Sequence, residues 1–211
     1  MALADKAGID SLSMRSLAQA LGVVPMALYK HVANKEELLD GMVDVVIGEI
    51  DALVVGEAWK DAVRHRILSA RRAMLRHPWA SQVIKSRTSP TPQALEYMDS
   101  MIGIFREGGF SVNLTHHVMH ALGSRMWGFT LEVFDSSLSS ESLDPQVQAG
   151  IIHEMAATYP HIVEVAIGAD LEGGSVVGLG CDDQFEFEFA LGLLLDGFER
   201  LRQQGWESAS H

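Results

Sequence analysis

The chain has 211 residues, of which 47% are hydrophobic, so it can form one large or two small domains with a sizeable core. No apolar run approaches the ~18–20 residues that span a bilayer, and the start MALADKAGID lacks a signal peptide, so we expect a cytoplasmic protein without membrane contact. The single cysteine, Cys181, excludes an internal disulfide and a multi-cysteine metal site. The net charge of −12 argues against a nucleic-acid partner for the chain as a whole, yet residues 1–35 hold four cations and only two acids. A cationic segment on an acidic body can approach DNA in one orientation and is repelled in the others.

The stretch Ser13–Lys35 predicts two short helices joined by a tight turn. Apolar residues recur at helical spacing in the first helix, where Ser13 stands at the N-cap and Gly22 at the left-handed position after the last turn. Pro25 fits the first turn of the second helix, because its missing N–H has no partner there. Two helices with a Gly-containing turn are typical of a helix-turn-helix, whose second helix can enter the DNA major groove. The alternative is a small helical hairpin that only packs on a core.

A longer helix follows this pair. We expect Leu28 of the second helix to face inward, and Asn34 to cap a third helix with Glu37 completing a capping box. The apolar stripe of the third helix continues to Ile50, so this helix should dock on the rest of the chain. We expect the GEA stretch at residues 56–58 to end it.

The remainder of the chain also reads as helical, and no segment shows the alternation of a half-buried strand. The predicted helices are Trp59–Arg76, Pro92–Arg106, Asn113–Phe134, Pro145–Thr158, Pro160–Ala169 and Asp183–Gln204. The predicted loops are Ser86–Pro92, Asp135–Pro145 and the glycine-rich Leu171–Gly180. The sequence therefore predicts an all-α protein, with an N-terminal helix-turn-helix head of three helices and a larger helical-bundle body.

The last predicted helix is apolar on two sides. One side carries Phe187, Leu191, Leu194, Phe198 and Leu201, and roughly the opposite side carries Phe185, Phe189 and Leu193. In a chain of this size, one side can pack on its own bundle while the other packs on a second copy. The alternative is a helix at the centre of a monomeric core.

The helix-turn-helix resembles the DNA-binding domain of the tetracycline-repressor (TetR) family. The similar run is LAQ…LGV at residues 17–23, followed by LYxHVxNKxxLLD at residues 28–40. The segment from Trp59 to about Arg202 is similar to the ligand-binding domain of the tetracycline-repressor branch. The shared features there are Trp59-x-Asp61, Thr88-x-Pro90, Gly109-Phe110-Ser111, Gly123, Gly128, Glu132 and the Phe- and Leu-rich final helix.

This resemblance implies a transcriptional regulator, in first place a repressor that a small-molecule effector releases from a palindromic double-stranded DNA operator. It implies a DNA-binding domain at residues 1–50, a ligand-binding and dimerisation domain at residues 51–211, and an Ω-shaped homodimer with Phe187, Leu191, Leu194 and Phe198 at the interface. Relatives have a longer, basic first helix, whereas only Met1–Ala7 precede Gly8 here. This helix therefore looks truncated, and we expect either that the natural start lies upstream or that the protein binds DNA weakly. The alternative is a ligand-binding or adaptor protein of the same fold with weak or no DNA binding.

Exposure on the predicted helices and the family pattern agree on a DNA surface. Met26 and Ala27 would offer apolar contact to thymine methyls, and Lys30 could reach guanine. The predicted DNA-binding residues are Arg15, Pro25, Met26, Ala27, Tyr29, Lys30, His31 and Lys35. Tyr29, His31 and Lys35 are expected to contact phosphates, although a structural role of His31 at the helix end stays open.

The resemblance also implies a ligand pocket. In the tetracycline binders a His, a Thr and a Glu surround a magnesium–drug chelate; here Thr88 and Glu132 remain, but Lys85 replaces the His and Arg66 replaces an amide. Because an ammonium repels Mg²⁺, we expect an apolar or aromatic ligand with an acidic or hydrogen-bonding group rather than magnesium–tetracycline. The other predicted ligand-binding residues are Met98, Met101, Ile102, His116 and Met119. The alternative is that Arg66 and Lys85 only neutralise Glu132 or face solvent.

Two further functions, metal binding and catalysis, have weaker support in the sequence. His116 and His120 share a helix face, as metal-binding pairs do, but no carboxylate lies within the next turn, so we expect no metal and no cofactor. The sequence contains no GxSxG elbow, HExxH pair or P-loop, so we expect no enzyme.

Overall fold

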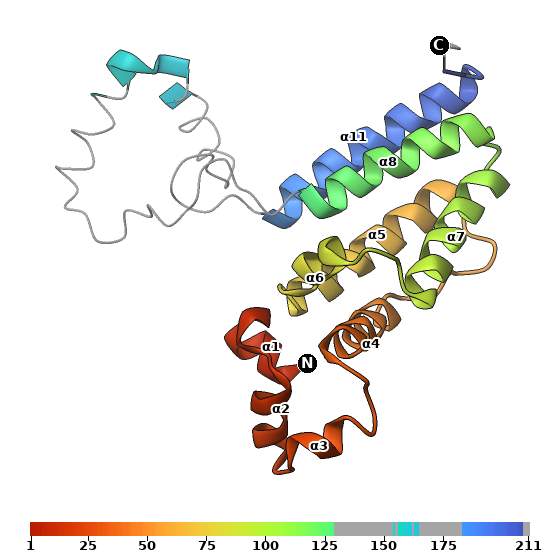
Figure 1. The fold of residues 1–211 in the computed structure, drawn as a ribbon. Coiled ribbons are helices and arrows are strands. Elements are labelled where there is room, and N and C mark those ends of the chain that lie inside the picture. Colours follow the sequence, from red (N-terminus) through yellow and green to blue (C-terminus); the bar gives the residue numbers. More distant parts are fainter. Residues whose placement is uncertain (129–153, 155, 162, 165–182, 209–211) are drawn as a thin grey trace. The chain divides into compact units, whose positions relative to one another are not determined.

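The computed structural model describes residues 1–128, 154, 156–161, 163–164 and 183–208. Every regular element in this part of the chain is a helix, which confirms the predicted all-α fold class (Figure 1). By its contacts the chain divides into two compact units, one of residues 1–127 with 200–211 and one of residues 128–199.

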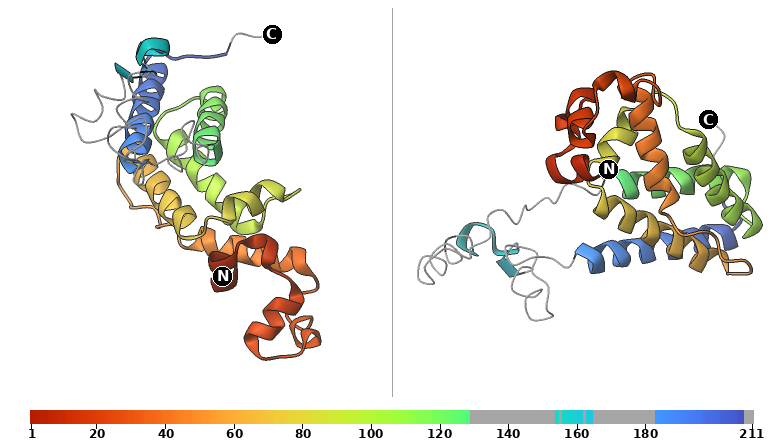
Figure 2. Two further views of the ribbon diagram at one scale, coloured as in Figure 1. Left: turned by 90° about the vertical axis from the view of Figure 1, so that its left-hand side faces the viewer. Right: turned by 90° about the horizontal axis from the view of Figure 1, so that it is seen from below.

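We call residues 1–48 the head and residues 59–128 the body. The head consists of α1 (Ala2–Ala7), the 3-10 turn η1 (Ile9–Ser11), α2 (Met14–Leu21), α3 (Pro25–Leu28) and α4 (Lys35–Gly48). The body consists of α5 (Trp59–Arg76), α6 (Ala80–Ser86), α7 (Pro92–Glu107) and α8 (Val112–Gly128), and the C-terminal helix is α11 (Asp183–Gln203). Figure 2 shows α2 and α3 against each other, and α4 leading from them to α5, α6 and α7, which it contacts.

The helix caps of the head lie where the sequence predicts them. The Ser13 hydroxyl accepts a hydrogen bond from the backbone N–H of Ser16 at 3.0 Å, and Ser16 Oγ accepts one from the N–H of Ser13 at 2.9 Å. Gly22 adopts the left-handed conformation with φ 68° and ψ 29°, which a side chain would strain. Asn34 Oδ1 accepts from the N–H of Glu37 at 2.9 Å. These caps fix the beginnings of α2 and α4, and thereby the position of α3 between them.

Helix α4 ends earlier than predicted, at Gly48 instead of near residue 56. The backbone N–H of Asp51 donates to the buried Ser69 Oγ of α5 at 2.8 Å, and Arg66 donates to the carbonyl of Asp51 at 2.7 Å. Helix α5 therefore binds the chain in a non-helical path directly after α4. This contact spans 18 residues of sequence, so helical periodicity within α4 gives no sign of it.

One core cluster joins the head to the body. From α4 it contains Leu39, Met42, Val43 and Val46. Its other buried members come from the first twelve residues and from the region of α5 and α6, and they are Ala4, Ile9, Leu12, Ala73, Trp79, Ala80 and Val83. The head is therefore fixed to the body by shared apolar burial and not by a flexible linker.

The body helices follow the prediction closely, with one addition. Helix α5 has the predicted bounds and α7 is one residue longer than predicted. The seven-residue α6 is not among the predicted helices, because so short a segment hardly shows a period. At the far end of the body, the Trp59 ring packs on Phe105 and Phe110 with centroids 5.8 and 4.8 Å apart, which fastens the start of α5 to the end of α7.

Helix α11 has one buried and one exposed apolar side. The buried side chains are Phe187, Leu191, Leu195 and Phe198, and the exposed ones, each 56–62% exposed, are Phe185, Phe189 and Leu193. Phe187, Leu191 and Phe198 are buried within the chain itself, and their place at a dimer interface stays a prediction. Leu194 is half-buried. Both sides of the helix carry large apolar residues in sequence, so the sequence alone does not show which side is buried within the chain.

Several predicted segments lie outside the described residues. These are the continuation of α8 to Phe134, the loops Asp135–Pro145 and Leu171–Gly180, and most of the helices Pro145–Thr158 and Pro160–Ala169. The described residues 154, 156–158, 160–161 and 163–164 are helical. Within the described ranges, no helix has the length and apolar character needed to cross a membrane.

Candidate DNA interface and ligand cavity

Helices α2 and α3 form a small unit held together by buried side chains. Ala18 of α2 and Leu28 of α3 are 1% and 8% exposed, so Leu28 faces inward as predicted. In the turn between the helices, the backbone N–H of Val23 donates to the carbonyl of Ala18 at 3.0 Å. The side of α3 opposite Leu28 is therefore exposed to solvent or a partner.

This outward side of α3 carries residues predicted to contact DNA. Met26 is 72% exposed and Tyr29 is 47% exposed, and Pro25 and Lys30 are exposed as well. Helix α3 has only four residues, so Lys30 lies in the turn after it. A short helix with an apolar side chain and a cation at its exit has the size and chemistry to enter a major groove.

The remaining predicted DNA-binding residues surround α3. Arg15 is exposed on α2, His31 is exposed in the turn after α3, and Lys35 is half-buried as the first residue of α4. Ala27 is half-buried. Cations on the elements that flank a recognition helix are suited to contact phosphates, which position the protein without reading sequence.

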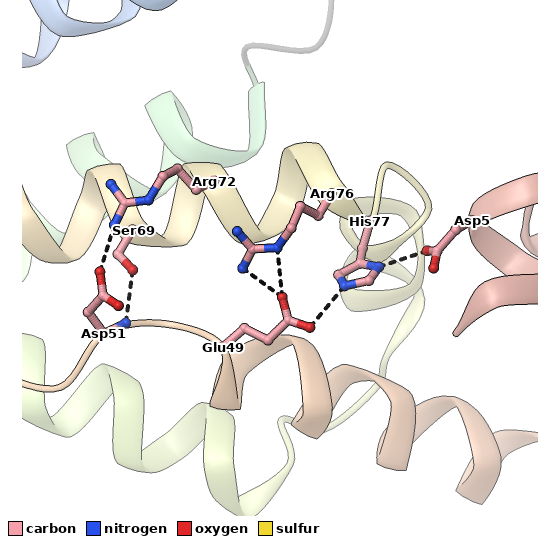
Figure 3. A network of polar contacts seen from close by, with 7 residues as sticks. All are labelled: Asp5, Glu49, Asp51, Ser69, Arg72, Arg76 and His77. Carbon is pink, nitrogen blue, oxygen red and sulfur yellow. Dashed lines mark hydrogen bonds and ion pairs between the residues drawn. The ribbon is translucent and has the colours of Figure 1, made fainter.

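A polar network joins the head to the body at the end of α5 (Figure 3). The buried His77 has Nδ1 2.7 Å from Asp5 Oδ1 of α1 and Nε2 3.1 Å from Glu49 Oε1. Trp79 Nε1 donates to the same Asp5 oxygen at 2.6 Å, and Arg76 Nη2 donates to Glu49 Oε2 at 2.6 Å. A histidine between two carboxylates binds both best as the imidazolium, because only that form donates from both nitrogens.

The pKa values in this network shift toward the charged forms. Burial lowers the pKa of His77, but the hydrogen bonds and charges of Asp5 and Glu49 outweigh burial, and the pKa is raised. Burial raises the pKa of Asp5, but hydrogen bonds from His77 and Trp79 outweigh it, and the pKa is lowered. The hydrogen bond from Arg76, followed by that from His77, lowers the pKa of Glu49. The network therefore stabilises an imidazolium between two carboxylates.

A second polar link joins the end of α6 to α4. Arg87 Nη2 lies 2.5 Å from Glu36 Oε2 and Nη1 lies 3.1 Å from Asp40 Oδ1. Burial lowers the pKa of Arg87, but the two carboxylates outweigh burial and the pKa is raised. Glu36 follows Lys35, so the segment after α6 contacts the end of α4 that carries a predicted DNA contact.

A partly open cavity of about 220 Å³ lies in the first compact unit, among α4, α5, α6, α7 and α8. Its wall is apolar except for one phenol. The lining residues are Ile47, Ile50, Ile67, Ala70, Met74, Ile84, Ala94, Tyr97, Met98, Met101, Met119, Leu122 and Gly123. A mostly apolar hollow with a single polar group is typical of a small-molecule site.

An open groove of about 510 Å³ adjoins the cavity along α7 and α8. Its lining residues are Met98, Ile102, Arg106, Val112, Thr115, His116, Met119 and His120. Met98 and Met119 line both hollows, so two flexible side chains belong to the walls of the cavity and of the groove.

The predicted ligand-binding residues divide into three groups. Those that line the cavity or the groove are Met98, Met101, Ile102, His116 and Met119. Arg66, Lys85 and Thr88 line neither hollow. Arg66 donates to the Asp51 carbonyl, whereas Lys85 and Thr88 are exposed on α6 and in the loop after it, so their part in ligand binding stays a prediction. Glu132 lies outside the described residues.

Tyr97 is a cavity residue that the sequence prediction missed. Arg66 lies over its ring with the guanidinium carbon 4.8 Å from the centroid, and Arg66 is held there by the Asp51 carbonyl at 2.7 Å and Ser100 Oγ at 2.9 Å. The signal was present in the sequence, because Tyr97 precedes Met101 by four residues and so shares its face of α7.

The histidines of α8 contact one another at the groove. The His116 ring centroid lies 5.2 Å from that of His117 and 4.6 Å from that of His120. In the part of the chain that the structure describes, no group of three or more His, Cys, Asp or Glu residues is arranged to hold a metal ion. At the groove His116 and His120 supply polar ring nitrogens to an otherwise largely apolar wall.

Comparison with known proteins agrees with this architecture. The family model "Tetracyclin repressor-like, C-terminal domain" matches residues 55–202, and the model "Bacterial regulatory proteins, tetR family" matches residues 1–42. An HTH-type transcriptional regulator of Saccharopolyspora erythraea is 35% identical over 109 residues, which are 51% of this chain and 46% of that protein. The chain thus spans less than half the length of this relative.

Two further similarities extend over nearly the whole chain. The HTH-type transcriptional repressor DrrR1 of Streptomyces coeruleorubidus is 29% identical over 218 residues, covering 98% of this chain and 77% of that protein. The crystal structure of the Streptomyces coelicolor TetR family protein ActR in complex with actinorhodin is 25% identical with a TM-score of 0.67, covering 94% of this chain and 92% of that one. Because one family model covers more than half of the sequence and a second covers the helix-turn-helix, the chain belongs to the tetracycline-repressor (TetR) family of bacterial transcriptional regulators.

Proposed function

We propose that this chain is a transcriptional repressor that binds a palindromic operator as a homodimer and is released by a small-molecule effector. The observation that carries the proposal is the double role of α4, which begins with Lys35 on the DNA side and places Ile47 in the cavity wall. The relative DrrR1 is a transcriptional repressor, and the similar protein ActR binds actinorhodin. The chain acts by binding rather than catalysis, in the cytoplasm where the operator lies.

Helix α4 supplies the connection between the two sites. Its 14 residues span about 20 Å at a rise of about 1.5 Å per residue. A molecule that fits the cavity better when α4 is displaced stabilises the displaced state, and by linkage it lowers DNA affinity by the same factor. The Arg87 link to Glu36 and Asp40 gives the body a second contact on the DNA end of α4.

At the DNA, the proposed roles follow exposure and chemistry. Met26 and Lys30 contact bases, whereas Arg15, Tyr29 and Lys35 contact phosphates. A dimer places two such heads on half-sites related by a dyad and separated by about one helical turn or a multiple of it.

The test uses DNA selected by the wild-type dimer from the promoter region beside its own gene. Lys35→Ala is expected to weaken binding to all sequences alike and to lower the salt slope by about one, because one phosphate contact is lost. Lys30→Ala is expected to cost about 1–3 kcal/mol on the selected operator and to relax preference at particular base pairs. Lys60→Ala, the same change in charge on α5, is the control and should leave operator affinity unchanged.

Two results would contradict the proposal. Equal losses of Lys30→Ala and Lys35→Ala on operator and random DNA would refute the assigned roles. A dimeric wild-type chain that retains no DNA at low salt would favour the ligand-binding or adaptor alternative instead.

A further inference from the structure

The cavity among α4 to α8 has one side-chain hydrogen-bond donor on its wall, and that donor is unpaired within the described residues. Tyr97 Oη is buried and makes no hydrogen bond within the described residues. No other side chain that lines the cavity carries an O–H or N–H group. Buried donors are ordinarily paired, because an unpaired one loses its hydrogen bonds to water without replacement. This exception lies on the wall of the hollow that is suited to a small molecule.

The phenol is held as a neutral donor. Burial raises the pKa of Tyr97 to about 12, although the charge of Arg66 acts in the opposite direction. The ring is fixed by Arg66 over its face, and Arg66 is itself bound to the Asp51 carbonyl and to Ser100 Oγ. Tyr97 therefore presents an O–H group in a defined place throughout the physiological pH range.

The same contacts keep positive charge out of the cavity. Arg66 is not part of the lining, and the lining contains no Lys, Arg, Asp, Glu or His. An ionised acid in such a hollow would lose its hydration without gaining an ion pair. Arg66 Nε is also buried without a hydrogen-bond partner. The competing interpretation is therefore an anionic ligand that binds Arg66, and the experiment must distinguish it from a neutral ligand that binds Tyr97.

We propose that the effector of this chain is a small, neutral, mostly apolar ring compound that presents one hydrogen-bond acceptor, such as a ketone oxygen, to Tyr97. This inference rests on the proposed function and names the chemical class of its effector. A cavity of about 150 Å³ accommodates benzene, so the 220 Å³ available here suits one or two fused rings. Met98 and Met119, which line both hollows, are the side chains past which the ligand enters from the groove.

Three probes of similar size test the class of ligand. They are 1-tetralone, which has a ketone acceptor, tetralin, which lacks it, and 1-naphthoate, which carries a negative charge. Calorimetric titration of the full chain is expected to show about fivefold tighter binding of 1-tetralone than of tetralin, the effect of one net hydrogen bond, and the weakest binding for 1-naphthoate. In Tyr97→Phe the preference for 1-tetralone should vanish, while tetralin should bind at least as tightly as before.

One control variant and one stability measurement accompany this comparison. Met101→Leu changes the wall without changing its polarity, so it should alter the affinities for 1-tetralone and tetralin by the same factor. Tyr97→Phe should melt at the same or a higher temperature than the wild type, because it removes an unpaired buried hydroxyl. A large drop in its melting temperature would show that the hydroxyl is paired and would overturn the inference.

Three binding results would also overturn it. The first is that Tyr97→Phe prefers 1-tetralone over tetralin as strongly as the wild type does. The second is that 1-naphthoate binds most tightly of the three probes and that Arg66→Met loses this binding. The third is that no probe binds. Operator binding measured on the same samples separates this inference from the proposed function. If 1-tetralone binds through Tyr97 but operator affinity does not change, the site exists but is not the effector site. If the chain binds its operator but none of the probes, only the cavity inference is refuted and the proposed function stands.

Discussion

Two glycines at α7 differ in what a methyl group would meet. A Cβ on Gly108, at the C-cap, would lie 2.8 Å from Trp59 Cβ and 3.1 Å from the carbonyl oxygen of Ile104, whereas a Cβ on Gly103 meets nothing within 4 Å. Gly108→Ala is therefore expected to lower the free energy of unfolding by about 1–3 kcal/mol, because Trp59 Cβ is tied to the backbone and cannot swing away. Gly103→Ala, in the helix interior, should raise it by about 0.5–1 kcal/mol. Urea denaturation measures both, and a Gly108→Ala protein as stable as the wild type would show that the α5–α7 junction shifts easily.

The His77 network predicts a pH dependence of stability. Because the pKa of His77 is raised on folding, its contribution is complete below the ordinary value of about 6.5 and is lost as pH rises through the raised value. Because the pKa values of Asp5 and Glu49 are lowered, their contribution is complete above about pH 4.5 and is lost as pH falls through the lowered values. The network is therefore strongest between about pH 4.5 and pH 6.5.

Melting curves of the wild type and His77→Gln at about pH 5.5 and about pH 8.5 test this dependence. The wild type should lose more stability than the variant between these values, because only the wild type gives up the network proton. His65→Gln, at an exposed histidine of α5, should keep the wild-type dependence. The same pH dependence in His77→Gln as in the wild type would show that other groups cause it.

Between elements, the end of α4 depends on α5. Ser69 is buried and its hydroxyl accepts the backbone N–H of Asp51 at 2.8 Å. Ser69→Ala is expected to cost about 1–3 kcal/mol of unfolding free energy, because it leaves this N–H without its partner. Hydrogen exchange should become faster at Asp51, while the exposed Ser89→Ala should change neither quantity. Unchanged exchange at Asp51 would mean that Arg66 and Arg72, which donate to the carbonyl and the carboxylate of Asp51, are sufficient to hold the path after α4.

For the whole molecule, we propose that two copies associate through the exposed side of α11. Phe185, Phe189 and Leu193 form a row of large apolar side chains that is unfavourable in water, and the family acts as dimers. Leu193→Glu is expected to give a monomer that has lost operator binding, because one head alone cannot contact both half-sites. Val55→Glu places the same charge on a fully exposed residue elsewhere and should leave the dimer intact.

Sedimentation and operator binding together test this assignment. Leu191→Glu should unfold the chain instead of dissociating it, because Leu191 is fully buried. A Leu193→Glu protein that remains dimeric, or a wild type that is monomeric, would refute the interface proposed on this side of α11.

The predictions from sequence are best where the causes are local. The caps at Ser13, Gly22 and Asn34 depend on hydrogen bonds and dihedral angles within three or four residues, so their residue types are sufficient to locate them. The exposure of Met26 and Tyr29 follows from the same local periodicity. Five predicted ligand residues line the cavity or the groove, because helical spacing places Met98, Met101 and Ile102 on one face of α7 and His116 and Met119 on one face of α8.

The sequence by itself determined the all-α class, the helix-turn-helix and the family, because periodicity, caps and motifs depend on residues that are close together in the chain. Only the tertiary structure decided where α4 ends, which side of α11 is buried, and that Arg66 lies over Tyr97 rather than in the cavity. The first and the third depend on partners 15 or more residues away in the sequence, such as Ser69 for Asp51 and Tyr97 for Arg66. The second depends on which of two apolar faces of α11 is buried. Such contacts depend on packing and on competition for hydrogen bonds among segments that are distant in the sequence, so local residue patterns do not predict them.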